Sequence, residues 1–245
     1  MDATLSLGRR AGAEALAAFA LVFAGCGAII ASERYDAALG TVGIALVFGL
    51  IIMAMVYATG HLSGAHINPA VTLAFTLTRH FPPRDALTYI AAQLAGATLA
   101  ALALLAVWPG QPAQLGATVP SVGAGSALAY EVVLTATLMF VIMAVATDTR
   151  AQGASAAIAI GGTVGLDALF GGPVTGASMN PARSLGPAMA SATWQDLWIY
   201  LVGPIAGAAL GALAYQLVRG EHQRPPTQPE PEEPRDGAHP VRLHA

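Results

Sequence analysis

The sequence predicts an all-α membrane protein with six transmembrane helices, two re-entrant half-helices and an inverted repeat of three helices plus three. Three observations predict this fold. Of the 245 residues, 55% are hydrophobic and only 10% are charged, and the mean hydropathy is +0.60; soluble domains have a far more charged composition. Long apolar runs recur along the chain. An Asn-Pro-Ala tripeptide occurs twice, at Asn68 and Asn180, each time shortly after such a run.

Six apolar runs are long enough for a helix to cross a bilayer, which takes about 20 residues. They cover residues 11–32, 41–59, 85–107, 126–147, 152–170 and 196–218. The segments between them carry the charged, proline and glycine residues that are typical of turns. The first run is long and has no clear cleavage site, so we expect it to stay in the protein. We expect one membrane domain over residues 1–218 and a disordered tail, rich in Pro and Glu, over residues 219–245.

Each Asn-Pro-Ala tripeptide predicts the start of a short helix. Asn is a preferred N-cap, and Pro suits the first helical position because no hydrogen bond is lost there. The apolar segments that follow, 70–78 and 182–190, have about half the length of a membrane span. We therefore expect two half-helices. They begin with matching triplets: Asn68, Pro69 and Ala70, and Asn180, Pro181 and Ala182.

The two halves of the chain, about 8–110 and 120–218, repeat one another. Glu14 in the first span corresponds to Glu131 in the fourth, and the segment that begins at Tyr89 corresponds to the one that begins at Tyr200. Each half has three spans, an odd number, so the second half starts from the opposite side of the membrane and the repeats are inverted. The two half-helices then approach from opposite faces. Their asparagines meet near the midplane, where non-helical backbone is tolerated only beside a cavity or inside the protein.

This arrangement favours water over ions. Two helix N-termini that face each other repel cations, because each carries about half a positive charge. A capping Asn uses its side-chain oxygen on backbone N–H groups and keeps its amide NH₂ for other partners. The amides of Asn68 and Asn180 can bind the oxygen of a passing water and turn its hydrogens away from its neighbours, which interrupts a proton wire. A capping role alone is the simpler alternative, but it does not explain their symmetric placement.

With these motifs, the chain resembles the aquaporin, or major intrinsic protein, family. The resemblance rests on His-Ile-Asn-Pro-Ala-Val-Thr, on Met-Asn-Pro-Ala-Arg-Ser-Leu-Gly-Pro-Ala, on the two glutamates and on the inverted halves, over about residues 8–218. It implies a channel domain with one pore per subunit, assembled as a homotetramer in the cell (inner) membrane. The motifs look most like those of the nodulin-26-like branch and its bacterial relatives. That branch is associated with water, glycerol and neutral metalloid acids.

The resemblance implies a selectivity filter formed by Phe48, Ala168, Ala177 and Arg183. A charge inside a membrane is costly and usually functional, which agrees with this role for Arg183. Strict water channels of the family usually carry His where Ala168 stands, so we expect a wider ring that admits solutes larger than water. Ser184, by contrast, resembles water channels, because glycerol facilitators carry Asp there. Many mercury-sensitive relatives carry Cys where Ala177 stands.

Four other residues attract attention. The resemblance implies that Glu14 and Glu131 support the two loops by accepting their backbone N–H groups, and a buried carboxylate needs such donors; proton coupling, as in transporters, is the alternative. His66 is expected to line the cytoplasmic pore mouth, and a pH gate is the lesser interpretation. Cys26 is expected to be a small buried residue without reactivity. With one cysteine and no cluster of ligand side chains, we expect no disulfide, metal or cofactor.

All positive charge comes from arginine, and its distribution orients the chain. With the N-terminus inside the cell, most arginines near the ends of spans fall on the cytoplasmic side, as the positive-inside rule requires. These are Arg9, Arg10, Arg79, Arg84, Arg150 and Arg219, whereas Arg34 falls outside. We therefore expect both termini to be cytoplasmic.

The leading interpretation is a passive channel for water and small neutral solutes, with glycerol first and urea or metalloid acids as further candidates. A strict water channel is the nearest alternative. A coupled secondary transporter also uses inverted repeats and broken helices, and a structural membrane protein with an occluded pore is a third possibility. An enzyme is not expected, because no nucleophile is paired with a base. The expected partners are the solutes, the lipid bilayer and copies of the chain, and not nucleic acid.

Overall fold

The computed structural model describes residues 5–148 and 155–219, and all regular secondary structure in this part of the chain is helical. The expected tail lies outside the described residues from position 220 on, as does Arg150. The elements in chain order are α1 (Leu7–Arg34), α2 (Gly40–Ser63), α3 (Pro69–Leu77), α4 (Pro83–Val107), η1 (Pro112–Gly116), α5 (Ala124–Thr147), α6 (Ala156–Thr175), α7 (Pro181–Ser191) and α8 (Leu197–Arg219). Six of these helices are long and apolar enough to cross a membrane. The predicted six spans and two short helices are thus confirmed.

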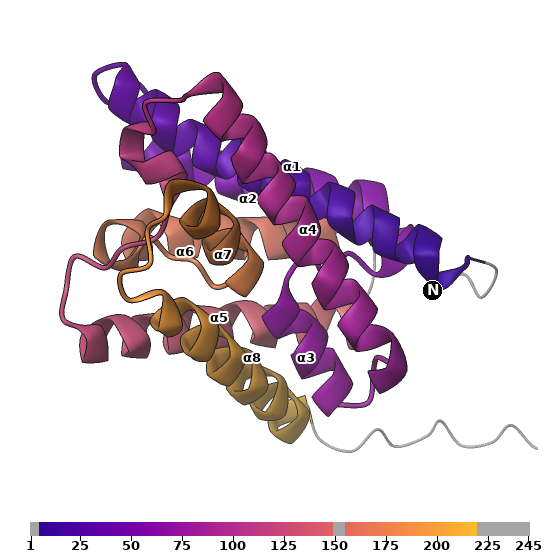
Figure 1. Ribbon diagram of the computed structural model, residues 1–245. Coiled ribbons are helices and arrows are strands. Elements are labelled where there is room, and N and C mark those ends of the chain that lie inside the picture. The colour runs from indigo at the N-terminus through magenta and orange to yellow at the C-terminus, as the bar shows by residue number, and fades with distance from the viewer. Residues whose placement is uncertain (1–4, 149–154, 220–245) are drawn as a thin grey trace, which may run out of the picture.

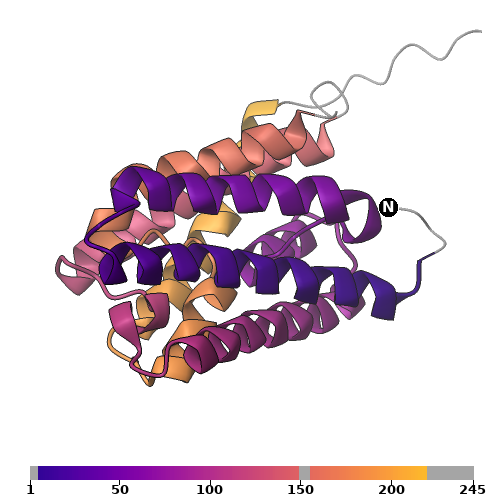
Figure 2. The same cartoon turned by 90° about the horizontal axis from the view of Figure 1, so that it is seen from above.

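The six long helices surround the two short ones (Figures 1 and 2). Helix α1 packs against α4 and α2, and the equivalent helix α5 packs against α8 and α6. The two halves meet where α2 contacts α6. Each short helix also crosses to the other half, because α3 packs against α8 and α7 packs against α4. The half-helices are therefore held inside the bundle by both repeats.

Small residues let the paired helices approach closely. A Cβ atom added to Gly96 on α4 would collide with the carbonyl oxygen of Ala15 on α1. At the equivalent place in the second half, a Cβ on Gly207 of α8 would collide with the carbonyl oxygen of Val132 on α5. Close backbone contact of this kind is how membrane helices associate without a hydrophobic driving force. Glycine at these positions serves packing within one chain.

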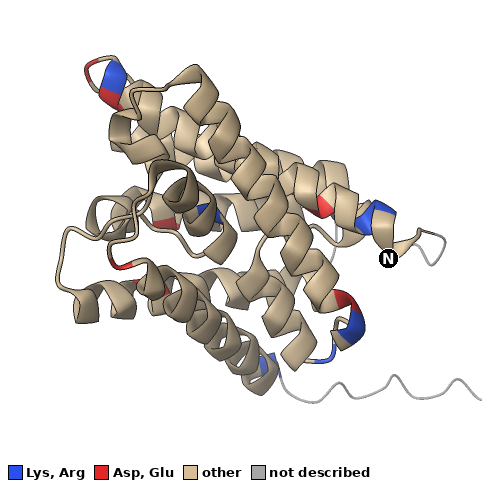
Figure 3. Ribbon diagram, in the orientation of Figure 1, with Lys and Arg blue, Asp and Glu red and all other residues tan. Residues whose placement is uncertain are grey.

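The charged residues are unevenly distributed along the bundle axis (Figure 3). Most of the blue ribbon lies at the end where the N-terminus starts, and helix α8 also ends there (Figures 1 and 3). One blue segment instead lies among the helices, and Arg183 is the buried arginine, with 1% of its surface exposed. The ends of the described chain therefore share one face of the bundle, as an even number of spans requires.

Candidate functional site

Both short helices begin at a capping asparagine. Asn68 has extended backbone angles, and its side-chain oxygen accepts a hydrogen bond of 2.9 Å from the N–H of Ala70. Asn180 has the same conformation, and its oxygen accepts from the N–H groups of Ala182 at 2.9 Å and Arg183 at 3.3 Å. Pro69 and Pro181 occupy the first helical position in each case. The capping that the Asn-Pro sequences predict is confirmed.

The amide groups of the two asparagines join the two halves. Asn68 Nδ2 donates to the carbonyl oxygen of Met179 at 2.7 Å, and Asn180 Nδ2 donates to that of Ile67 at 3.0 Å. Each carbonyl belongs to the residue directly before the opposite asparagine. The sequence predicts amides that are entirely available to a solute, whereas here each amide gives one of its two N–H groups to the opposite loop. One N–H per asparagine remains, in a fixed orientation.

Glu14 lies on α1 and supports the loop before α3. Its Oε1 accepts from Ser63 Oγ at 2.7 Å and from the N–H of His66 at 2.9 Å. Its Oε2 accepts from the N–H of Ile67 at 2.6 Å and from Gln93 Nε2 at 2.8 Å. The carboxyl group is fully buried, and four donors satisfy both of its oxygens.

Glu131 lies on α5 and holds the second loop in the same way. Its Oε1 accepts from Thr175 Oγ1 at 2.7 Å and from the N–H of Ser178 at 3.0 Å, and its Oε2 accepts from the N–H of Met179 at 2.8 Å. Within the described part of the chain, no side chain takes the place that Gln93 has in the first half, because the matching residue on α8 is Pro204. The second loop is therefore held by one donor fewer.

The loops need this support because their backbones are strained. Each long helix before a loop ends at a left-handed glycine, Gly64 (φ 90°) or Gly176 (φ 85°). Two further residues in each loop, separated by one position, are left-handed although they carry a side chain. Their φ angles are 47° at Ala65, 57° at Ile67, 41° at Ala177 and 53° at Met179. Such conformations cost about 1–3 kcal/mol each and persist where the surroundings impose them.

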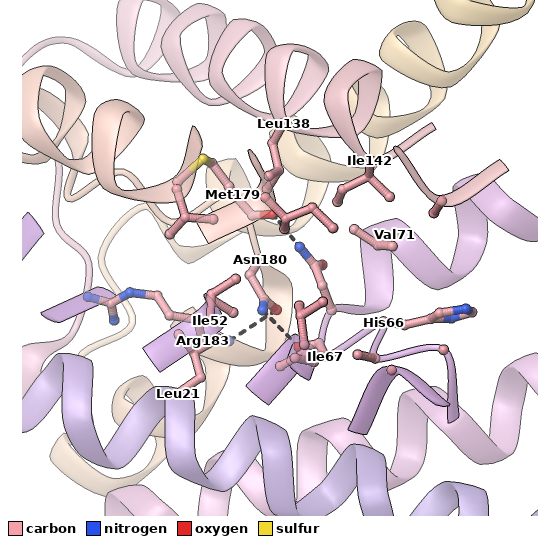
Figure 4. A pocket seen from close by; sticks show the side chains of 18 of the residues that line it. Leu21, Ile52, His66, Ile67, Val71, Leu138, Ile142, Met179, Asn180 and Arg183 are labelled. Atoms are coloured by element: carbon pink, nitrogen blue, oxygen red, sulfur yellow. Dashed lines mark hydrogen bonds between the residues drawn. The ribbon is translucent and has the colours of Figure 1, made fainter. Parts of the chain in front are cut away.

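A cavity of about 470 Å³ runs past both asparagines. The side lined by α2, α3 and α5 is apolar, with Ile52, Val71, Leu138 and Ile142 around it (Figure 4). Arg183 and His66 lie on either side of Asn180 along it (Figure 4). The lining includes seven of the residues singled out from the sequence: Phe48, His66, Asn68, Ala168, Ala177, Asn180 and Arg183. Glu14 and Glu131 do not line it and act from behind the loops.

The buried Arg183 side chain is held in place by contacts of its guanidinium group. Its Nη1 donates to the carbonyl oxygen of Gly116 at 2.8 Å and contacts Cys26 Sγ at 3.3 Å. Its guanidinium carbon lies 5.0 Å from the centre of the Phe48 ring, within the range of a cation–π contact. Its Nε is buried and has no hydrogen-bond partner among the described residues. This leaves a fixed cation with an unused donor beside the cavity.

Phe48 leans against α1 where that helix has a glycine. A Cβ atom on Gly25 would overlap the Phe48 ring, so the ring can occupy this place only because position 25 has no side chain. Ala168 and Ala177 also line the cavity, and each has only a methyl group as its side chain. Arg183 is thus the one polar side chain of this group, and two of the other three are small.

His66 lines the cavity but is enclosed by aromatic rings. The centres of Phe75, Phe81 and Tyr89 lie 4.8, 4.7 and 5.2 Å from its own. Its Nδ1 lies 3.1 Å from Thr72 Oγ1. This packing restricts the ring to one position, which is a poor basis for a gate that swings on protonation.

Several residues near the site give no signal in the sequence. Gly116 is in a loop without periodicity, and its role depends on the carbonyl group that every residue has. His80 lies in the loop after α3 and lines one end of the cavity; partial burial, together with the nearby Arg219 guanidinium, lowers the pKa of His80 below its usual range. Asp167 precedes Ala168, is 1% exposed, and has an Oδ2 without a hydrogen-bond partner in the described chain. The sequence marks Asp167 as a charge within an apolar span, directly before Ala168, but it does not identify a partner for the carboxyl group.

Comparisons with known proteins agree with this geometry. The family model described as "Major intrinsic protein" matches residues 2–215. The chain is 52% identical over 207 residues to "Aquaporin NIP1-4" of Oryza sativa subsp. japonica, covering 84% of this chain and 76% of the relative. It is 48% identical to "Nodulin-26" of Glycine max, with the same coverage of each. Among solved structures, "X-ray structure of the aquaglyceroporin from Plasmodium falciparum" superposes with a TM-score of 0.77 at 25% identity, covering 87% of this chain and 97% of that one.

Proposed function

Because the chain belongs to the major intrinsic protein family, we propose that the cavity beside Asn68 and Asn180 is its conducting pore. The protein is a multi-pass membrane channel for water and small neutral solutes such as glycerol, and it is not an enzyme. The observation that carries the proposal is the reciprocal hydrogen bonding of the two asparagines at the wall of one cavity. This bonding leaves one oriented amide N–H of each for a passing oxygen atom.

Proton exclusion follows from the same residues. The N-termini of α3 and α7 face each other, and their partial positive charges repel hydronium and metal cations. A water bound by the two remaining N–H groups points its own hydrogens away from both neighbours, so it cannot relay a proton. The apolar wall formed by Leu138 and Ile142 offers the water no other partner. Neutral solutes with a hydroxyl or carbonyl oxygen can make the same contact.

The filter that we propose consists of Phe48, Ala168, Ala177 and Arg183. The positive charge of Arg183 lies beside the path of the solute and attracts its oxygen atoms, and the Phe48 ring gives the carbon atoms of the solute an apolar surface. The two alanines leave room opposite. A small polyol has hydroxyl groups along one edge and carbon along the other, which suits this pairing. We therefore place glycerol before urea and boric acid as solutes beyond water.

We further propose a cell membrane location with cytoplasmic termini and a homotetramer with one pore per subunit. The accumulation of arginines at the end where α1 begins and α8 ends supports this orientation (Figure 3). Large apolar side chains are exposed on the outward faces of the long helices, among them Leu46, Leu87 and Leu217. Such side chains face lipid or another subunit. Cross-linking in membranes, with detection of a four-subunit species, tests the assembly.

One assay distinguishes the solutes. Proteoliposomes that contain the full chain are mixed rapidly with sucrose, glycerol, urea or boric acid, and their volume is followed by light scattering. We expect fast shrinkage in sucrose, and in glycerol shrinkage followed by reswelling that is faster than in empty vesicles. Shrinkage in glycerol without reswelling would make the protein a strict water channel. Flux that saturates, depends on an ion gradient or has a high activation energy would instead indicate a coupled transporter.

The pore asparagines can be tested by Asn180→Asp. The new carboxylate would face the carbonyl oxygen of Ile67, which now accepts a hydrogen bond, and it would place a negative charge where the helix termini repel cations. We expect water flux to fall by about tenfold, or cations to enter, since the loss of a hydrogen bond to a buried partner costs about 1–3 kcal/mol. Osmotic shrinkage and a cation-sensitive dye in the same vesicles measure both effects. Unchanged water flux together with unchanged ion exclusion would contradict this role for Asn180.

Mercurial reagents are expected to inhibit the channel weakly. The chain has a single thiol, Cys26, and its surface is 0% exposed, whereas Ala177 stands where mercury-sensitive relatives carry Cys. A buried thiol without access to solvent reacts slowly. Water flux before and after treatment with a mercurial measures this. Strong inhibition that disappears in Cys26→Ser would show that Cys26 is accessible from the pore.

A further inference from the structure

The single cysteine lies against the filter arginine. Cys26 Sγ is 3.3 Å from Arg183 Nη1 and 3.7 Å from the carbonyl oxygen of Gly116, to which the thiol donates. That carbonyl oxygen also accepts from the same Nη1 at 2.8 Å. The thiol, the guanidinium and the carbonyl group thus form a closed triangle of contacts behind the pore. We call Cys26, Gly116 and Arg183 the arginine clamp.

The loop that supplies the carbonyl group is strained. Left-handed backbone occurs at Gln111 (φ 51°) and then at four successive residues of η1: Ala113 (49°), Gln114 (49°), Leu115 (56°) and Gly116 (74°). Left-handed conformation costs non-glycine residues about 1–2 kcal/mol each. Such strain persists only where the surroundings impose it, and it is concentrated at functional sites. Here the loop brings one carbonyl group against Arg183.

Cys26 packs directly against the backbone of this loop at Gly116. A Cβ atom added to Gly116 would lie 2.7 Å from Cys26 Cβ, so the loop backbone touches the cysteine directly. The residues around them are apolar, because Val22, Leu104 and Leu115 belong to the same buried cluster as Cys26. Among the described residues, the only acceptors within hydrogen-bond distance of the guanidinium are Cys26 Sγ and the Gly116 carbonyl oxygen. Without the thiol, one N–H of Nη1 would face a dry apolar wall.

We propose that Cys26 is a positioning residue for Arg183 and that it determines solute selectivity by setting how far the guanidinium extends into the pore. The inference rests on the proposed function, because it assigns the filter a support on α1. A thiol fits this place because it both accepts from Nη1 and donates to the carbonyl group. It is also small and apolar enough for the cluster around it. The hydroxyl group of serine keeps both hydrogen-bonding functions, whereas alanine keeps neither.

The first test compares three variants of the full chain in proteoliposomes. Cys26→Ala is expected to raise the ratio of glycerol to water permeability by roughly two- to fivefold, the range that one weak hydrogen bond supports. Cys26→Ser should restore a ratio close to that of the unmodified chain. Val22→Ala is the matched control, because it removes more volume from the same cluster, one turn away on α1, without removing a polar atom. An unchanged ratio in Cys26→Ala, failure of serine to restore it, or an equal change in Val22→Ala would overturn the proposal.

The second test does not depend on transport. Because the chain has one cysteine, its infrared S–H stretching band reports on the clamp alone. Because Arg183 Nη1 contacts both the sulfur and the Gly116 oxygen to which the thiol donates, Arg183→Val should shift the band, while Val22→Ala leaves it in place. Arg183→Lys, which cannot reproduce the planar donor group, provides the same test if the valine variant does not fold. A band that is identical with and without Arg183 would overturn the clamp even if solute transport is normal, and vesicles that fail to conduct would overturn the proposed function alone.

Discussion

Replacing Glu131 with alanine is expected to prevent the channel from folding into a stable, conducting form. The change removes the acceptor for the N–H groups of Ser178 and Met179 and for the hydroxyl group of Thr175. Each buried donor without a partner costs about 1–3 kcal/mol, so the loss of the acceptor for three donors should lower the free energy of unfolding by about 3–9 kcal/mol. The loop before Asn180 would then lose the support that holds its left-handed residues. Thermal unfolding in detergent and the yield of monodisperse protein measure the effect.

Two further variants show whether the acceptor itself is responsible. Glu131→Gln keeps one side-chain oxygen but places an NH₂ group against the N–H that Glu131 Oε2 now binds, so it should recover only part of the stability. Glu14→Ala removes four hydrogen bonds rather than three and should be at least as damaging. A Glu131→Ala protein that unfolds at the unmodified temperature and conducts normally would show that the loop holds its shape without the carboxylate.

The fold could be predicted from the sequence because its determinants are local or repeated. Asn-Pro at the start of each half-helix is a capping signal within two residues, and it appears at Asn68 and Asn180 in matching contexts. The apolar runs have the length that the bilayer imposes. Three spans in each half require the inversion. None of these steps needs knowledge of a contact between distant residues.

The details of the site depend on distant contacts, and the sequence does not contain a signal for them. The hydrogen bond from Asn180 to Ile67 uses a carbonyl group, which every residue has, and the bond forms only because the halves interpenetrate. The same is true of Gly116, whose carbonyl group reaches Arg183 from a loop with irregular left-handed backbone. Cys26 could be predicted to be buried, but its neighbour across the pore wall could not be named. The repeat in the sequence thus predicts the architecture, whereas the contacts made by backbone carbonyl groups can be identified only from the structure.

Arg183→Val is expected to leave a folded protein whose channel no longer excludes protons efficiently. The fully buried guanidinium is the one cation in the filter that we propose, and a cation that passes about 5 Å from it is repelled by about 3 kcal/mol at an effective dielectric constant of about 20. Its loss should therefore raise proton leakage by roughly a hundredfold. Water flux should change less, because a water molecule carries no net charge and is not repelled by the guanidinium. A pH-sensitive dye inside proteoliposomes, with sucrose shrinkage measured on the same sample, gives both quantities.

The size and the charge of Arg183 contribute separately to selectivity, and two substitutions distinguish the two contributions. Arg183→Lys keeps the positive charge but not the planar group that contacts Gly116 and Phe48, so it should still exclude protons while admitting larger solutes. Arg183→Val should admit both, and its proton leak should remain limited by the helix termini at Asn68 and Asn180, which form a second barrier. Adding Asn180→Asp to Arg183→Val should then increase the leak beyond that of either change alone. An Arg183→Val channel with the proton leak and solute order of the unmodified protein would mean that the asparagine barrier alone sets selectivity and that this buried arginine serves the fold.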